Sequence, residues 1–372
     1  MRRLKVTGHV RGLSGYDHHT REFVREFVRQ GVDVEMRHVS GWSAERPAHA
    51  REIWFDRLTG PVPANTVLHF LMPTIAVCEP GHTNINYTMF EADRIPAAWA
   101  ATARQMDMTI LPTETARRAW IDSGVPEDRL RVSPLGVDGA RFAACAEPLA
   151  LEVAGRPVGG FAVRLLNVTD LSPRKHYLGL LQTWLVATRR EDDAVLILKN
   201  NAFQPDVWPV FQAELSALEQ RTGRSFGDAA PMLILGHPLG NVEMPALYTA
   251  ATHYVSLSRG EGWDMPMMEA AASGLVLIAP RHTAYLSYLD DQSAHWIDAR
   301  LAPAMVDCRI RAADRIWFEG LNWWEPNLDS AIAVIRSVVD GSAPPLPSPR
   351  DRIVQAFSWA NSAARLLAIL PE

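Results

Sequence analysis

The sequence predicts an α/β protein built from two Rossmann-like domains, each containing a doubly wound parallel sheet. Three observations support this expectation. Two successive series of apolar strands that alternate with helices follow each other along the chain. An Ala/Pro/Gly-rich stretch at residues 143–160 separates the two series and is the expected linker. The length of 372 residues also exceeds the usual size of a single hydrophobic core.

The first predicted domain, residues 1–150, starts with a β-α-β unit. An apolar strand at residues 3–10 is followed by the turn "RGLSG" and by a helix whose apolar side chains repeat at helical spacing up to Gly31. Further strands are predicted in "VDVEMRHV", "TVLHFLM", "NINYTMF", "MDMTILPT" and "RLRVSPLGVD", and a further helix in "TETARRAWIDSG". These elements complete one α/β domain.

The second predicted domain, residues 160–345, repeats the alternation. Strands are expected in "FAVRLLNVTD", "AVLILK", "MLILG", "THYVSLS" and "LVLIAP", and helices in "HYLGLLQTWLVATRR", "DVWPVFQAELSALEQRTG" and "NLDSAIAVIRSVVDG". The Pro-rich break "APPLPSPR" follows, and residues 350–372 are expected to form one terminal helix.

Composition narrows the class of protein. Apolar residues make up 48% and charged residues 21%, as in an ordinary globular protein. A formal charge of −5 and a pI near 6.2 argue against a nucleic-acid partner held by a broad basic surface. The widely spaced Cys78, Cys145 and Cys308 suggest neither a disulfide framework nor a zinc site. With no signal peptide or membrane span apparent, we expect a cytoplasmic protein; peripheral contact with the inner face of a membrane and the oligomeric state stay open.

The segment "SRGEGWDMPMMEAAASG", residues 258–274, places two acids beside the start of a helix. Pro266 suits the first helical turn, with Asp264 or Met265 as the N-cap, and Gly274 ends the helix. Glu261 then lies in the loop before the helix, whereas Glu269 lies one turn into it. We expect the two carboxylates to be staggered along one ligand near an electropositive helix N-terminus.

Two staggered carboxylates suggest a ligand with two sugars. A carboxylate accepts two hydrogen bonds side by side, which matches a vicinal diol of ribose or of a hexopyranose. Two sugars joined by a diphosphate form a nucleotide-sugar, whose phosphates require cations. Arg174 and Lys175, in "LSPRKHY", follow the first strand of the second domain, at the sheet edge where open α/β sheets bind ligands.

The segment "SLSRGEGWDMPMMEAAASGLVLIA" resembles the signature of family 4 retaining glycosyltransferases of the GT-B fold, in which two glutamates are separated by seven residues. The resemblance extends over nearly the whole chain, through "GLSG", "RVSPLGVD", "SPRK", "LILGHPLGNVEMPALYTAATHYVSLS" and "FSWANSAARLLAIL". It implies two Rossmann-like domains that face each other across an inter-domain cleft, with the terminal helix crossing back to the first domain. It also implies transfer of a sugar from a UDP- or GDP-sugar with retention of anomeric configuration.

The resemblance also implies roles for individual residues. Glu269 would bind the ribose hydroxyls, Glu261 with the backbone of the four following residues would hold the transferred sugar, and Arg174 with Lys175 would neutralise the diphosphate. Three further positions complete the donor side: the helix cap Ser14 with Gly15, Thr169 in a stretch where relatives carry Arg, and His237, which would face the base mostly through backbone groups. The four residues after Glu261 are Gly262, Trp263, Asp264 and Met265.

Two departures from the family pattern concern sugar selectivity. Asp264 stands where many members have Gly, and "PRHTAYLSYL" replaces a Gly-rich segment. On the acceptor side, Glu91 stands where related enzymes place a His, and His18 and Thr113 lie in loops expected to line the acceptor site. The sequence leaves open the acceptor, which is a glycan, a lipid-linked glycan or a small natural product, and the nucleobase of the donor.

The expected catalytic residues are Glu261, Lys175 and Arg174. No residue is a convincing nucleophile, which favours substitution on one face of the sugar, with the cations stabilising the leaving diphosphate. No Asp-x-Asp motif is present, so neither a metal nor another cofactor is expected. The alternatives are a nucleotide-sugar epimerase or phosphorylase on the same fold, an NAD-dependent oxidoreductase, for which the glycine spacing is wrong, and a sugar-binding protein without activity.

Overall fold

The computed structural model describes residues 2–46, 52–143, 147–200 and 206–371, so Cys145 lies outside the described residues. Its contacts divide the chain into two compact units, Met1–Val137 with Gln355–Glu372, and Asp138–Val354. The boundary therefore lies before the expected linker at 143–160. Residues just after it pack on the second unit: the backbone amide of Leu149 donates to Ala246, and a Cβ on Gly139 would lie 2.3 Å from a methyl group of Val354.

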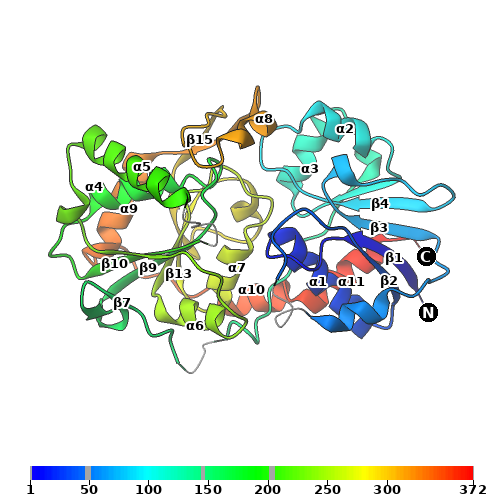
Figure 1. The fold of residues 1–372 in the computed structure, drawn as a ribbon, viewed down its shortest axis with the longest axis horizontal. Coiled ribbons are helices and arrows are strands. Elements are labelled where there is room, and N and C mark those ends of the chain that lie inside the picture. Colours follow the sequence, from blue (N-terminus) through cyan, green and yellow to red (C-terminus); the bar gives the residue numbers. More distant parts are fainter. Residues whose placement is uncertain (1, 47–51, 144–146, 201–205, 372) are drawn as a thin grey trace. The chain divides into compact units, whose positions relative to one another are not determined.

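The first unit contains a parallel six-stranded sheet in the order β2-β1-β3-β4-β5-β6 (Figure 1). The strands are β1 (Arg3–Gly8), β2 (Asp33–His38), β3 (Thr66–Phe70), β4 (Thr83–Tyr87), β5 (Met108–Leu111) and β6 (Leu130–Val132). The helices between them are α1 (Gly15–Arg29), α2 (Ala97–Ala103) and α3 (Glu114–Ile121). Every strand predicted for this domain is present, although only β3 is buried along its whole length, and β1 alternates buried with partly exposed residues.

Helix α1 begins and ends where the sequence predicts. Ser14 caps it, and Asp17 completes a capping box with the Ser14 backbone. Gly31, just after its end, has a φ of +81°, a conformation that glycine adopts without steric cost. Phe23, on the buried face of α1, stacks on Phe70 of β3 at a centroid distance of 5.4 Å.

The C-terminal segment forms two helices rather than the single helix predicted, α10 (Arg350–Ala356) and α11 (Trp359–Ile369). The break falls at Ser358, whose backbone is extended and whose Oγ accepts the amide hydrogen of Asn361 as an N-cap. Helix α11 lies beside α1 (Figure 1), with Trp359 edge-on to Phe23 at 5.3 Å. Residues from Gln355 onward thus belong to the first unit.

The second unit contains a parallel six-stranded sheet in the order β11-β10-β9-β12-β13-β14. Its strands are β9 (Val163–Val168), β10 (Ala194–Lys199), β11 (Met232–Leu235), β12 (His253–Val255), β13 (Val276–Pro280) and β14 (Ala294–Ile297). Its longer helices are α4 (Tyr177–Ala187), α5 (Val207–Thr222), α6 (Glu243–Ala250), α7 (Met265–Ala272) and α9 (Leu328–Val339). The apolar residues of α4, α5 and α9 form a continuous core with the central strands.

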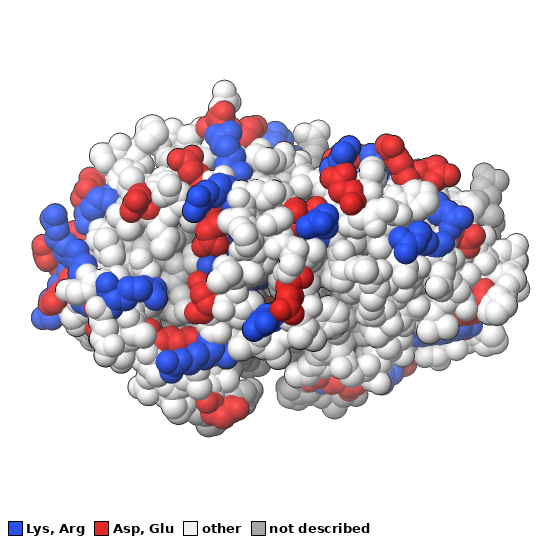
Figure 2. All heavy atoms as spheres, turned by 90° about the horizontal axis from the view of Figure 1, so that it is seen from above, with Lys and Arg blue, Asp and Glu red and all other residues white. Residues whose placement is uncertain are grey.

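Several short elements were not predicted. The hairpin β7 (Glu152–Val153) and β8 (Arg156–Pro157) lies inside the expected linker. A second antiparallel pair, β15 (Ala299–Pro303) and β16 (Asn322–Pro326), encloses the short helix α8 (Arg315–Phe318) and contains part of the Trp-rich stretch. On the face of the molecule in Figure 2, acidic and basic side chains are interspersed without a broad area of one sign.

Candidate functional site

The site in the second unit is built around the start of helix α7, at the carboxyl end of strand β12. Asp264 is the N-cap residue, with a left-handed backbone (φ 59°, ψ 73°), and Pro266 occupies the first turn. Gly274, with a φ of +84°, ends the segment. Glu261 and Asp264 are both buried although they precede the helix. The loop therefore keeps two acids out of bulk water, which requires partners nearby.

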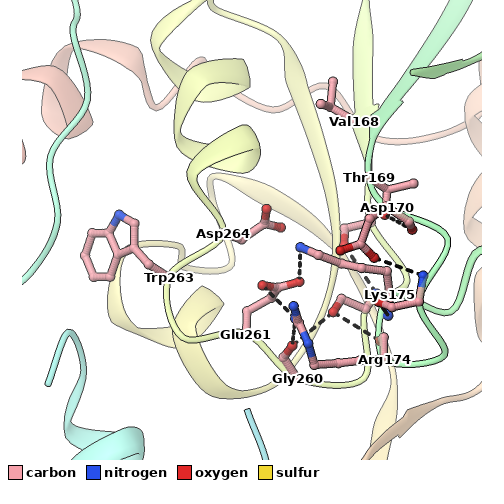
Figure 3. A network of polar contacts seen from close by, with 12 residues as sticks. Val168, Thr169, Asp170, Arg174, Lys175, Gly260, Glu261, Trp263 and Asp264 are labelled. Carbon is pink, nitrogen blue, oxygen red and sulfur yellow. Dashed lines mark hydrogen bonds and ion pairs between the residues drawn. The ribbon is translucent and has the colours of Figure 1, made fainter. Parts of the chain in front are cut away.

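Glu261 receives those partners from the loop after β9 (Figure 3). Lys175 Nζ lies 2.6 Å from one carboxylate oxygen of Glu261, and Arg174 Nη1 lies 3.1 Å from the other. Arg174 Nη1 also donates to the carbonyl of Gly260 at 2.6 Å. The structure thus brings the three predicted catalytic residues together. Glu261 forms ion pairs with both cations that were expected to bind a diphosphate.

The charges in this cluster shift one another's ionisation. Burial alone would raise the pKa of Glu261, but Lys175 and Arg174 hold it below its ordinary value. Burial would lower the pKa of Lys175, whereas Glu261 and Asp264 raise it. Burial, followed by the charge of Glu261, raises the pKa of Asp264 to about 6. At neutral pH the cluster therefore contains two cations and two carboxylates.

Glu269 has a different environment, on the side of α7 that faces helix α6. It is half-buried, and its carboxylate accepts a hydrogen bond of 2.8 Å from the hydroxyl of Tyr248. Burial, followed by the charge of Glu269, raises the pKa of Tyr248 well above 10, so the phenol stays a neutral donor. Tyr248 thereby fixes one carboxylate oxygen of Glu269. Sequence analysis did not identify this tyrosine, which lies in an Ala-rich helix with no visible motif.

The remaining donor-side residues fall into separate settings. Trp263 is 1% exposed, and Figure 3 shows its ring pointing away from the Glu261 cluster. Its backbone carbonyl accepts from the Tyr288 hydroxyl at 3.0 Å, which ties the loop to the segment after β13. Thr169 follows β9 and donates its hydroxyl hydrogen to the carbonyl of Asp170. His237 is exposed in the loop after β11, the edge strand of the sheet. Buried Gly262 and half-buried Met265 flank Trp263 and Asp264 in the same loop.

In the first unit, Ser14 and Gly15 start helix α1 at the carboxyl edge of the sheet. The Asp17 carboxylate accepts from the Gly12 amide at 2.7 Å and from the Ser43 hydroxyl at 2.8 Å. Burial would raise the pKa of Asp17, but the hydrogen bonds from Ser14, Ser43 and Gly12 lower it. The Gly12 amide, one of the turn's hydrogen-bond donors that were expected to face a phosphate, thus already binds the Asp17 carboxylate.

The three residues expected on the acceptor side have contacts within the first unit. His18, on α1, lies edge-on to Trp359 at 5.9 Å and has Nδ1 4.0 Å from the Glu22 carboxylate. Thr113 is buried, and its Oγ1 caps helix α3 by accepting from the Ala116 amide at 3.1 Å. Glu91, after β4, is half-buried; burial chiefly, and the charge of Glu91 in addition, raise the pKa of nearby Tyr16.

Arg259 is a residue of this region that sequence analysis missed. Its side chain is 3% exposed, and its guanidinium binds both oxygens of Asp307, at 2.9 and 2.8 Å. Its backbone amide donates to the carbonyl of Arg174 at 2.8 Å. The signal in the sequence was a lone arginine directly before Gly260 and Glu261, and only the partner acid, far along the chain, makes it interpretable.

The described residues offer neither a metal cluster nor a membrane-spanning helix. No group of three or more His, Cys, Asp or Glu side chains in that part of the chain is arranged to hold a metal ion. Within the same residues, no helix has both the length and the apolar character needed to cross a bilayer.

Comparison with known proteins gives a match at the level of fold. Neither a protein-family model nor a curated protein matches the sequence. Among solved structures, HepE from Anabaena, in complex with UDP and glucose, is similar with a TM-score of 0.66 and 11% identity over 99% of both chains. Trehalose 6-phosphate synthase from Burkholderia multivorans is similar with a TM-score of 0.64 and 12% identity, over 99% of this chain and 97% of the other. AviGT4, a glycosyltransferase involved in avilamycin A biosynthesis, is similar with a TM-score of 0.58 and 16% identity, over 99% of this chain and 96% of the other.

These similarities span almost the whole chain and include both parallel sheets. The predicted fold class is therefore confirmed: the protein has the α/β fold of GT-B glycosyltransferases, with two six-stranded parallel sheets. The identities lie between 11% and 16% for these three structures, a range in which the fold is shared but the chemistry has to be argued from the site.

Proposed function

We propose that this protein is a glycosyltransferase that moves a sugar from a nucleotide-sugar, a UDP- or GDP-sugar, to a hydroxyl of an acceptor. The observation that carries the proposal is the cluster of Arg174, Lys175 and Glu261 at the carboxyl edge of the second sheet, beside the start of α7. The fold supports it, because the similar HepE structures contain UDP and UDP-glucose.

In this proposal the diphosphate competes with Glu261 for Arg174 and Lys175. A diphosphate carries more charge than one carboxylate and accepts several charge-assisted hydrogen bonds from an arginine and a lysine. When the cations turn toward the phosphates, the Glu261 carboxylate becomes available to hydroxyls of the transferred sugar. The same cations then stabilise the charge that develops on the leaving diphosphate.

Glu269, at a different position on α7, is assigned to the ribose. Tyr248 orients its carboxylate, and a carboxylate accepts two hydrogen bonds side by side, which suits a vicinal diol. Thr169 and the residues around His237 follow strands β9 and β11 at the same carboxyl edge of the sheet, which suits the diphosphate and the base respectively.

We infer retention of anomeric configuration without a covalent intermediate, because the site offers Glu261 paired with two cations rather than a free nucleophile. We also propose that transfer requires neither a divalent metal nor another cofactor, since the Arg174–Lys175 pair would neutralise the diphosphate. Unchanged turnover in EDTA, and product of the donor's anomeric configuration by NMR, are the expected results.

Calorimetric titration with UDP, GDP, ADP and NAD tests the proposal. One nucleoside diphosphate should bind, and Glu269→Ala should weaken its binding by about tenfold or more, since a hydrogen-bonded charged group is lost. Glu319→Ala is the matched control, because Glu319 is an exposed acid at the C-cap of α8, in the same unit, where it pairs with Arg315. Binding of NAD alone, or equal affinities for the two variants, would contradict the proposal.

A further inference from the structure

Asp264 adopts a left-handed backbone conformation, which is uncommon for residues other than glycine. Its φ of 59° and ψ of 73° lie in the left-handed region, where a glycine has no steric cost and most other residues are strained. Its side chain does not cap helix α7, so helix capping does not account for an aspartate at this position. The contacts of the carboxylate therefore bear on why an aspartate stands here.

The carboxylate of Asp264 has one satisfied oxygen and one unsatisfied oxygen. Asp264 is 6% exposed, and Oδ2 accepts a hydrogen bond of 2.8 Å from the Tyr285 hydroxyl, which also lies 2.7 Å from Ser256 Oγ. Oδ1 is buried and has no hydrogen-bond partner among the described residues. Buried carboxylate oxygens are normally paired, so an unpaired one that is held in place suggests a ligand contact.

The position of Asp264 relates it to the cluster already described. Figure 3 shows its carboxylate on the side of the loop that faces the Lys175 side chain and the Glu261 carboxylate. The Lys175 ammonium group donates its hydrogen bond to Glu261 rather than to Asp264. The two carboxylates and the cations Lys175 and Arg174 balance in charge, so a neutral hydrogen-bond donor suits Oδ1 better than a further cation does.

We propose that Asp264 is a specificity-determining residue whose Oδ1 accepts a hydrogen bond from a hydroxyl of the transferred sugar. The inference rests on the proposed function and adds the side chain that would select the sugar. Tyr285 holds the other oxygen and thereby fixes the orientation of the carboxylate. A site that is built to accept a hydrogen bond from a hydroxyl discriminates strongly against an analogue that lacks it, because its buried polar atom is then left unpaired.

The test compares wild type with Asp264→Asn and Asp264→Gly in calorimetric titrations. Asparagine keeps the size of the side chain and tolerates a left-handed backbone, but it replaces one acceptor oxygen with a donor NH₂ group. Glycine removes the side chain and fits the backbone without strain, so at least this variant is expected to fold. The ligands are UDP, UDP-glucose, UDP-galactose and UDP-N-acetylglucosamine, with the corresponding GDP series if GDP binds more tightly than UDP.

The measured quantity is the ratio of affinity for the preferred nucleotide-sugar to affinity for its nucleoside diphosphate. Both variants should bind the nucleoside diphosphate within about twofold of wild type, while the ratio falls by about tenfold or more. Asp291→Asn, an exposed acid paired with Arg281, should leave both values unchanged. An unchanged ratio in both Asp264 variants would overturn the inference. Absence of nucleoside diphosphate binding in wild type would overturn the proposed function first.

Discussion

Arg259 and Glu325 form a two-point ion pair, with Nε 2.7 Å and Nη2 2.9 Å from the two carboxylate oxygens. Glu325 lies on strand β16, whereas Arg259 directly precedes the loop that contains Glu261. The same guanidinium donates to the carbonyl of Pro173 at 3.0 Å, next to Arg174. One buried side chain therefore joins both loops of the candidate site to the β15–β16 pair, and we expect it to position the site without touching substrate.

Replacing Arg259 with methionine should destabilise the protein, because Asp307 and Glu325 would lose their shared cation. We expect a decrease of about 2–3 kcal/mol in the free energy of unfolding, below the value for a fully buried pair because both acids are partly exposed. Urea denaturation measures it. The same change at Arg315, whose pair with Glu319 is exposed on both sides, should cost no more than about 0.5 kcal/mol. Equal values for the two variants would mean that Arg259 does not hold these loops together.

Lys175→Met should reduce turnover more than it reduces donor affinity. If Lys175 stabilises charge that develops on the leaving diphosphate, kcat should fall by about 10²- to 10³-fold with a smaller change in KM. Steady-state kinetics of nucleoside diphosphate release separates the two constants. Lys5→Met is a matched control, since Lys5 lies on β1 of the first unit, 2.7 Å from His82 Nε2. A raised KM with unchanged kcat would mean that Lys175 only binds the donor.

Gly12→Ala should disrupt the turn before α1. A Cβ there would lie 2.0 Å from Ser43 Oγ and 2.6 Å from Asp17 Oδ2, two atoms that hydrogen-bond to each other. We expect a loss of about 1–3 kcal/mol in unfolding free energy, the usual cost of overpacking. Gly60→Ala is the control, because nothing lies within 4 Å of the added Cβ. Similar denaturation midpoints for both variants would show that the capping network rearranges easily.

Strands β10 and β13 were predictable because burial on both faces leaves a nearly continuous apolar run in the sequence. The cap of α1 was predictable for a similarly local reason, since Ser14 and Asp17 are three residues apart. The break at Ser358 was missed because an apolar helical period runs through it, and only the extended backbone of that serine shows that a new helix begins.

The acids and cations of the candidate site were identified from the sequence, but their pairing was not. Spacing showed that Glu261 precedes a helix and that Lys175 follows a strand; their 2.6 Å contact depends on β9 and β12 being neighbours in the sheet. Tyr248, Tyr285 and Arg259 were missed for the same reason. Each acts through a partner at least 21 residues away in the sequence, and no local pattern marks such a pair.

The raised pKa of Asp264 predicts a specific dependence of stability on pH. Burial first, and the charge of Glu261 second, raise the pKa from 3.8 to about 6, against the lowering effects of Lys175, Arg174 and the Tyr285 hydroxyl. Because the folded state holds this proton more tightly than the unfolded state, the contribution of Asp264 to stability falls as pH rises through about 6.

Asp264→Asn isolates this contribution. Between pH 5 and 7, wild type should lose about 1 kcal/mol of unfolding free energy relative to the variant. The lowered pKa of Glu261 keeps that group ionised over this range in the wild type, so it adds no opposing trend. Urea denaturation at several pH values measures the difference. A difference that is constant with pH would mean that Asp264 is already ionised at pH 5, and that burial beside Glu261 does not hold its proton.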